Sequence, residues 1–191
     1  MTYNIPNIIT YFRIALIPCL VMIFYLPEIY LEAQQKNIWA TAIFILAAIS
    51  DWLDGYLARK LDQTSKFGAF IDPVADKLIV IAALILLVEL GRVESIIAFI
   101  IIAREFTVSS LREWMAMHGK SGSIAVAFVG KLKTTMQMIA ILFLLYYENI
   151  LFIPTALIGK ILIYIAALLT IISMLYYLKI AFNMLKEKKT I

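Results

Sequence analysis

Four aspartates lie close together in the sequence, in two pairs whose spacing could support metal chemistry. Asp51 and Asp54 are three residues apart, and Asp72 and Asp76 are four residues apart. Residues three or four apart share one face of a helix, so each pair presents two carboxylates in one direction. Carboxylates without cysteine or histidine nearby suit hard cations such as Mg²⁺, Mn²⁺ or Ca²⁺. Four of them can share two ions about 3.5–4 Å apart, an arrangement that clamps a phosphoryl group under attack.

The segments around these carboxylates are apolar, so four negative charges there need compensation. Apolar residues make up 63% of the 191-residue chain, against about 45–50% in soluble domains. One aspartate deep in a transmembrane helix costs about 2.5–3.5 kcal/mol. The positive partners that we consider are Arg59, Lys77 and divalent cations. In the alternative interpretation, the aspartates only cap helix ends and pair with nearby lysine and arginine.

Six apolar stretches are the elements that must position the aspartates. Each is long enough to cross a bilayer core, which takes about 20 helical residues. No stretch alternates as strands do, and no linker or repeat divides the chain. We therefore expect an all-α polytopic membrane protein with six transmembrane helices in a single domain, 1–191. The predicted spans are 8–26, 38–57, 73–90, 95–115, 124–147 and 156–182.

The distribution of lysine and arginine predicts the orientation of these spans. Basic residues gather in the breaks after the second and fourth spans and in the C-terminal tail, whereas the other breaks are mostly acidic. Such residues are enriched in cytoplasmic loops. Both termini and the aspartate pairs should therefore face the cytoplasm, in a bacterial inner membrane. Pro6 suggests a helix entry, preceded by a short N-terminal segment at the membrane interface.

Composition also excludes several classes of protein. The single Cys19 allows no intrachain disulfide, and the single His118 allows no mechanism that needs two histidines. The seven glycines form neither a dinucleotide-binding fingerprint nor a phosphate-binding loop. The net charge of +4 reflects membrane orientation in a chain this apolar, so we expect no nucleic-acid partner.

The acidic segment resembles the complete motif of the CDP-alcohol phosphatidyltransferases. Eight identities match with every spacing within 26 residues, namely Asp51, Asp54, Gly55, Ala58, Arg59, Gly68, Asp72 and Asp76. The chain length and the six predicted spans are also similar to the minimal core of this family. The resemblance therefore covers essentially the whole chain.

The resemblance implies a reaction in which an alcohol displaces CMP from a CDP-linked lipid, here CDP-diacylglycerol. It implies that two divalent cations, Mg²⁺ or Mn²⁺, are bound by Asp51, Asp54, Asp72 and Asp76, and that Asp76 is also the general base. It places Gly55, Ala58 and Gly68 against the cytidine nucleotide, with Arg59 near its phosphates. The resemblance also implies that the chain forms a homodimer. Without the resemblance, close helix packing would be the favoured explanation of each glycine.

Basic residues in the fourth and fifth spans indicate which alcohol is used. Together with segments of the first span, they are similar to bacterial members of the family that use glycerol 3-phosphate. The dianionic phosphate of that acceptor calls for several fixed cations, and Arg prefers bidentate contacts to it. The expected phosphate-binding residues are Arg104, Arg112, Lys131 and Lys133. Alternatively, the lysines and Arg112 anchor the chain to anionic lipid, and Arg104 only pairs with Glu105 or Glu113.

The sequence also indicates further site candidates and alternative functions. Asn7, Thr10 and Arg13 in the first span and Thr134 in the fifth are further site candidates. For Thr10 and Arg13, an interfacial position is favoured over a role facing the substrate. Alternative functions are transfer to another acceptor such as serine or inositol phosphate, and a cation transporter or channel that conducts through the aspartates. A non-catalytic scaffold would leave the whole motif unexplained.

Overall fold

The described part of the chain consists of six long helices. The computed structural model describes residues 5–61, 66–117 and 124–188, without some side chains near the ends of these ranges. The helices are α1 (Ile5–Tyr25), α2 (Ala33–Leu61), α3 (Lys66–Glu89), α4 (Ser95–Met117), α5 (Ile124–Tyr146) and α6 (Thr155–Lys188). The expectation of an all-α protein is therefore confirmed. The predicted N-terminal interfacial segment lies mostly outside the described residues.

Three of these helices contain stretches that are long and apolar enough to cross a membrane, namely Asn7–Tyr25, Ala33–Asp54 and Thr155–Phe182. In α3 and α4, the charged groups that include Asp76 and Arg104 interrupt the apolar sequence. The apolar part described for α5, Lys133–Tyr146, is shorter. The structure thus supports an integral membrane protein, whereas six crossings remain a prediction.

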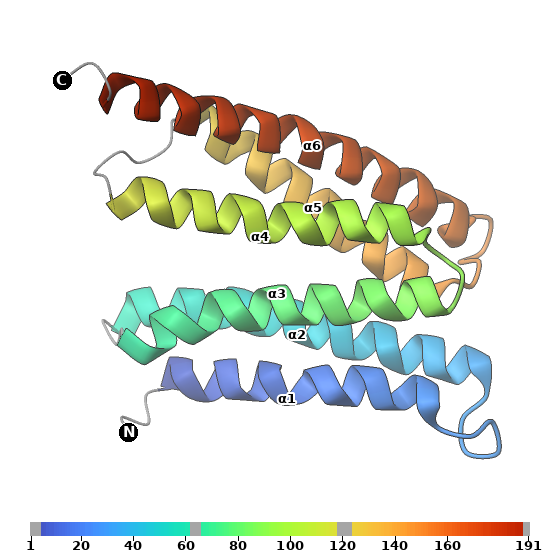
Figure 1. Cartoon of the computed structure of the whole chain (residues 1–191). Helices are drawn as coiled ribbons and strands as arrows, with labels where there is room; N and C mark the ends of the chain where they lie inside the picture. The colour runs from blue at the N-terminus through green and yellow to red at the C-terminus, as the bar shows by residue number, and fades with distance from the viewer. Residues whose placement is uncertain (1–4, 62–65, 118–123, 189–191) are drawn as a thin grey trace.

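The helices run back and forth in two groups of three. Helix α1 packs against α2 and α3, and α6 packs against α4 and α5 (Figure 1). The two groups meet where α2 and α3 contact α5 and where α3 contacts α4. The starts of α1, α3 and α5 lie at one end of the bundle, together with the ends of α2, α4 and α6 (left in Figure 1). We call this end the site end, because it carries the aspartates.

The core is apolar and small residues let the helices approach closely. One cluster includes Leu20, Phe44, Leu84 and Ile141, which are fully buried. Gly159 of α6 packs directly on α5, where an added Cβ would lie only 2.9 Å from a side-chain carbon of Leu144. Such contacts are typical of helix pairs in membranes.

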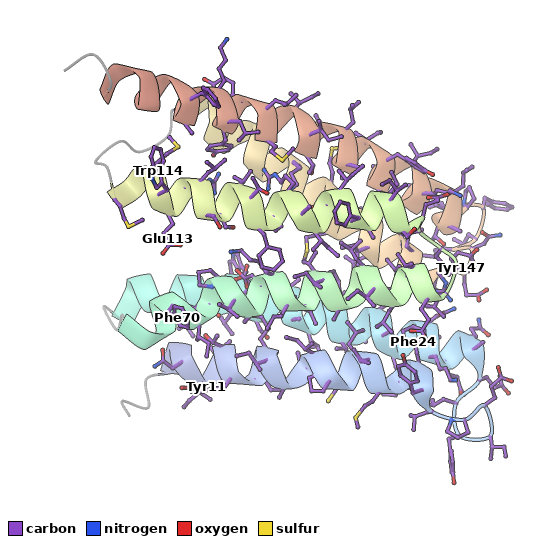
Figure 2. All side chains as sticks on the ribbon, in the orientation of Figure 1. Tyr11, Phe24, Phe70, Glu113, Trp114 and Tyr147 are labelled. Carbon is purple, nitrogen blue, oxygen red and sulfur yellow. The ribbon has the colours of Figure 1, made fainter. Side chains whose placement is uncertain are left out.

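Many large apolar side chains also point outward along the bundle (Figure 2). Examples on different helices are Met22, Ile85, Phe99 and Leu168, each more than half exposed. A soluble monomer rarely exposes so extensive an apolar surface. In a bilayer these side chains contact lipid, which is as apolar as they are.

The third helix begins earlier than predicted. Its predicted span started at Pro73, but α3 starts at Lys66 and contains the proline. Transmembrane helices tolerate proline because neighbouring groups satisfy the freed backbone. Asp72 and Gly68 therefore lie inside the helix, not in the loop that precedes it.

Candidate active site

One arginine of α1 lies at the centre of the acidic residues. The Arg13 side chain is fully buried. Its Nη1 atom lies 3.1 Å from Asp51 and also contacts Asp76, and its Nη2 atom contacts Asp54. Because α2 carries Asp51 and Asp54 and α3 carries Asp76, one guanidinium joins three helices.

The fourth carboxylate is bound by the same face of α1. The Thr10 hydroxyl donates a hydrogen bond to Asp72 of α3. Asn7, Thr10 and Arg13 are spaced three apart on α1, and all three are buried, the last two completely. Thr10 and Arg13 are therefore buried inside the bundle, whereas a position at the membrane interface was favoured from the sequence. The reason is that their faces of α1 pack onto the acidic faces of α2 and α3.

The donor set suits a hard divalent cation in its chemistry. The four carboxylates offer only oxygen, which Mg²⁺ and Mn²⁺ prefer. Within the described residues, however, no three acidic, cysteine or histidine side chains form a ready cation cage. The guanidinium of Arg13 lies where three of the carboxylates meet. The residues thus fit a divalent cation by the type of their ligand atoms. To surround the ion, either the carboxylate oxygens that do not contact Arg13 must bind it, or Arg13 must move aside.

A cavity of about 770 Å³ separates the acidic residues from α4 and α5. Asp51, Asp76 and Lys77 line it from α2 and α3, and Arg13 lines it from α1. Figure 2 shows Glu113 on the side of α4 that faces this space. The polar residues that line the cavity from α4 and α5 are Glu105, Ser109, Arg112, Glu113, Thr134, Thr135 and Gln137. The carboxylates of α2 and α3 therefore face Arg112 across one cavity, whose α4 side also carries two glutamates.

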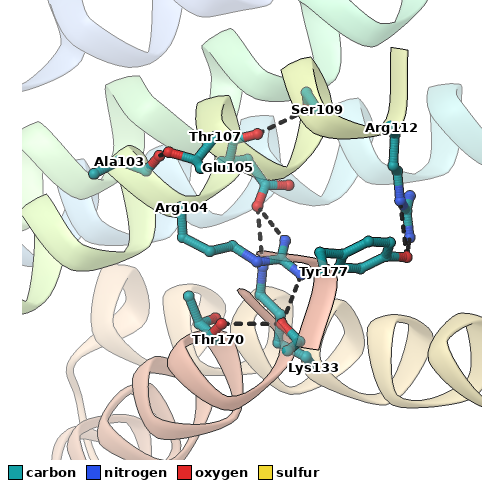
Figure 3. Close-up of polar contacts among 10 residues, drawn as sticks. Ala103, Arg104, Glu105, Thr107, Ser109, Arg112, Lys133, Thr170 and Tyr177 are labelled. Atoms are coloured by element: carbon teal, nitrogen blue, oxygen red, sulfur yellow. Dashed lines mark hydrogen bonds and ion pairs between the residues drawn. The ribbon is translucent and has the colours of Figure 1, made fainter. Parts of the chain in front are cut away.

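Two of the predicted phosphate-binding residues form a buried network with Glu105 (Figure 3). The Oε2 atom of Glu105 accepts hydrogen bonds from Arg104 at 2.9 Å and from Lys133 at 3.0 Å. Arg104 also donates to Ser173 of α6 at 2.9 Å. Lys133 is fully buried, and neither it nor Arg104 lines the cavity. The structure therefore agrees with the alternative interpretation of the sequence, in which Arg104 pairs with Glu105.

Arg112 differs from these two cations because it is exposed and lines the cavity. The Tyr177 hydroxyl of α6 accepts hydrogen bonds from its Nε at 3.0 Å and its Nη2 at 2.6 Å. The guanidinium carbon also lies 5.0 Å from the centre of the Tyr177 ring, in the range of a cation–π contact. Arg112 is thus a cation held in place beside the cavity.

The other predicted site residues divide into described and undescribed ones. Gly68 is buried in α3, and Thr134 lines the cavity. Four more residues were predicted to lie near the nucleotide or the acceptor, namely Gly55, Ala58, Arg59 and Lys131. The positions of their side chains are outside the described part of the structure.

Three residues of this site were not predicted as site residues from the sequence. Glu105 was predicted only as a partner of Arg104, and neither Gln137 nor Tyr177 was predicted. Glu105 was detectable, because an acidic residue next to an arginine inside an apolar span needs a buried positive partner. Gln137 lies four residues after Lys133, on the same face of α5. Tyr177 carries no such signal in the sequence.

These features define a class of helical membrane protein in which an acidic cluster faces a fixed arginine across a cavity. The family model of the CDP-alcohol phosphatidyltransferases matches residues 3–182. Three relatives share one name, CDP-diacylglycerol–glycerol-3-phosphate 3-phosphatidyltransferase. The protein of Haemophilus influenzae is 50% identical over 95% of both chains. That of Escherichia coli K12 is 46% identical over 95% of this chain and 96% of its own. That of Wigglesworthia glossinidia brevipalpis is 45% identical, with 96% and 97% covered.

The chain therefore belongs to the CDP-alcohol phosphatidyltransferase family. The predicted resemblance is confirmed over nearly the whole length, and the motif from Asp51 to Asp76 lies within the matched residues.

Proposed function

We propose that the chain transfers a phosphatidyl group from CDP-diacylglycerol to glycerol 3-phosphate, giving phosphatidylglycerol phosphate and CMP. The names of the relatives support the choice of donor and acceptor. One structural observation carries the proposal: Asp51 and Asp76 line the same cavity as Arg112. With divalent cations on the carboxylates of one wall and a fixed arginine on the other, such a cavity would hold a pyrophosphate and a phosphorylated alcohol side by side.

Asp76 is the proposed general base. Its side chain is 44% exposed, whereas that of Asp54 is 6% exposed, so Asp76 is within reach of a ligand in the cavity. It takes the proton from the 1-hydroxyl of glycerol 3-phosphate. The resulting oxygen attacks the β-phosphorus of CDP-diacylglycerol, the bond from this phosphorus to the CMP oxygen breaks, and CMP leaves.

Asp51, Asp54, Asp72 and Asp76 are the proposed ligands of two divalent cations, Mg²⁺ or Mn²⁺. When bound, such ions would stabilise charge on the pyrophosphate and lower the pKa of the attacking hydroxyl. Thr10 and Arg13 orient these carboxylates from α1 by the contacts described above. We further propose that Gly55, Ala58, Arg59 and Gly68 contact the cytidine nucleotide, as the family motif implies.

Arg112 is the proposed primary cation for the acceptor phosphate, since it is exposed to the cavity and held by Tyr177. Lys131 and Thr134, near the start of α5, are the proposed further contacts. Arg104 and Lys133 lie behind Glu105, so they add positive potential to the wall. Their direct contact with the phosphate requires Glu105 to move.

The decisive experiment is a CMP-release assay on the purified protein with CDP-diacylglycerol and one acceptor at a time. We expect release with glycerol 3-phosphate in the presence of Mg²⁺ or Mn²⁺, and little with serine or inositol phosphate. Release with another acceptor alone would keep the family reaction and replace the acceptor. Cation flux through reconstituted protein without any CMP release would instead support the transporter alternative.

We also propose that the site end faces the cytoplasm of a bacterial inner membrane and that two chains form a homodimer. Basic residues in the sequence around the site end support this orientation. The apolar side chains exposed on α3 and α4, such as Ile85 and Phe99, offer surface for a second copy as well as for lipid. Chemical cross-linking in membranes at low protein density tests the dimer.

A further inference from the structure

A buried glutamine on the cavity wall lacks a hydrogen-bond donor for its oxygen. Gln137 of α5 is 3% exposed and lines the cavity. Its Oε1 atom has no partner within the described structure. Buried polar atoms in native proteins are nearly always hydrogen-bonded, so an orphan beside a cavity indicates a group that a ligand supplies.

A second acceptor atom lies on the same wall. The two buried cations both bind Oε2 of Glu105, and Figure 3 shows the other carboxylate oxygen pointing away from them. Among the described residues, the hydrogen bonds and ion pairs of this carboxylate all involve Oε2 and none involves Oε1. Because Glu105 lines the cavity, its second oxygen is available to a ligand there.

These two atoms select against a phosphate and for a hydroxyl. An anionic phosphate oxygen is repelled by the carboxylate of Glu105, whereas a hydroxyl can donate to Oε1 of Glu105 or of Gln137. A half-turn of the Gln137 amide exchanges its oxygen and its NH₂ group, so it can also donate to the same hydroxyl. Arg112 lies seven residues after Glu105, two turns along the same face of α4. The wall therefore offers a cation and, separately, hydroxyl-binding groups.

We propose that Gln137 and Glu105 recognise the acceptor hydroxyl that neighbours the attacking one. In glycerol 3-phosphate this is the 2-hydroxyl, while the 1-hydroxyl attacks. The inference rests on the proposed function and adds the feature that distinguishes a phosphorylated polyol from a phosphorylated simple alcohol. Gln137 is then a specificity-determining residue of the acceptor site.

The test compares two acceptors in the CMP-release assay, glycerol 3-phosphate and 3-hydroxypropyl phosphate, which lacks the 2-hydroxyl. We expect the wild-type protein to prefer glycerol 3-phosphate in kcat/KM. In Gln137→Leu, this preference should fall about tenfold, the value of one or two neutral hydrogen bonds. The value of kcat/KM should fall for glycerol 3-phosphate and stay nearly unchanged for the simpler acceptor. Met136→Leu, on α5 but off the cavity wall, should keep the wild-type preference.

A second readout separates recognition from a structural role. Since Gln137→Leu removes an unsatisfied buried oxygen, the ligand-free variant should unfold at the same temperature as the wild type or about 2–4 °C above it. A lower midpoint would mean that Gln137 supports the fold, and an unchanged acceptor preference would mean that it does not contact the hydroxyl. Either result overturns the inference. A wild-type protein that uses neither acceptor would instead overturn the proposed function.

Discussion

A single buried guanidinium compensates the charges of several carboxylates around it. Arg13 is fully buried and contacts Asp51, Asp54 and Asp76. Removing one partner from a buried charge cluster leaves uncompensated charge in a medium of low polarity. The position of Arg13 on α1 therefore determines whether the carboxylates of α2 and α3 can stay close together.

Replacing Arg13 with methionine tests this dependence. We expect Arg13→Met to destabilise the cation-free protein by about 3–5 kcal/mol, the usual cost of breaking a buried charge cluster. Added Mg²⁺ should raise the unfolding midpoint of the variant more than that of the wild type, because a cation then compensates the same carboxylates. Thermal unfolding with and without Mg²⁺ measures both effects. Equal midpoints for variant and wild type in chelator would contradict this role.

The second prediction at the scale of a residue concerns Asp76. Asp76→Asn keeps the shape of the side chain but removes the base, so CMP release should fall at least about a hundredfold, the lower range for a general base. The unfolding midpoint should change little, because Asp51 and Asp54 still compensate the charge of Arg13 in this variant. Near-normal turnover in this variant would remove Asp76 from its proposed role.

At the scale of the helices, Arg92 connects three elements at the end of the bundle opposite the site. It lies between α3 and α4 and donates to the Leu144 and Leu145 carbonyls at the end of α5, both at 2.9 Å. It also donates to Asn37 near the start of α2 at 2.7 Å and lies 4.2 Å from the centre of the Tyr147 ring. Carbonyls at a helix end have no partner inside the helix, so Arg92 satisfies them.

Arg92→Met should therefore destabilise the protein by about 2–4 kcal/mol, since it leaves these helix-end carbonyls without their donor. The KM values for both substrates should stay near those of the wild type at low temperature, because the site lies at the other end. Chemical unfolding measures the loss of stability, and the CMP-release assay measures the KM values. A change in KM without loss of stability would show that the two ends of the bundle are coupled.

A second contact at this end connects the start of α4 to α6 and depends on pH. Glu94 pairs with Lys160 at 3.0 Å. Hydrogen bonds from the Tyr164 hydroxyl and the Lys160 ammonium lower the pKa of Glu94 to about 2, from an ordinary value of 4.5. A lowered pKa stabilises the folded state above the ordinary value, and this contribution is lost as the pH falls through the lowered one.

The stability advantage of the wild type over Glu94→Gln should accordingly be constant above about pH 5 and shrink as the pH falls toward 2. The advantage is small because the pair is exposed. Unfolding midpoints of both proteins across this range give the measurement. An advantage that instead grew on acidification would contradict the direction of the pKa shift.

At the scale of the whole molecule, the cavity lies where the two groups of three helices meet. The acidic cluster and its partner Arg13 belong to α1, α2 and α3, whereas Arg112 on the opposite wall belongs to α4 and is held by α6. Neither group alone contains both halves of the proposed site. The back-and-forth course of the helices brings both halves to the site end of the bundle (Figure 1).

The orientation of this end can be tested with fused reporter enzymes. Alkaline phosphatase fused after Glu32, Gly91 or Phe152 should be active, since it is active only outside the cytoplasm and these residues lie in the connections opposite the site end. The same enzyme fused at the C-terminus should be inactive. The reverse pattern would place the site outside the cytoplasm.

The sequence by itself determined the class of fold, the family and the helix faces that the four aspartates share. Apolar composition and length predict membrane helices because a bilayer demands that backbone groups pair within each segment. Helical spacing places Asp51 with Asp54, and Asp72 with Asp76, on shared faces. Local rules of this kind need no knowledge of which helices pack together.

Tertiary structure decided the partners of these residues. Arg13, predicted to lie at the interface, is buried among carboxylates because α1 packs against both α2 and α3. Lys133 was predicted to bind phosphate directly but lies behind Glu105, because α4 and α5 both pack against α6 and this brings the two side chains within hydrogen-bond distance. Pairings of this kind connect residues 28 to 63 positions apart. They depend on how whole helices pack, and the charge and spacing within one helix do not encode that packing.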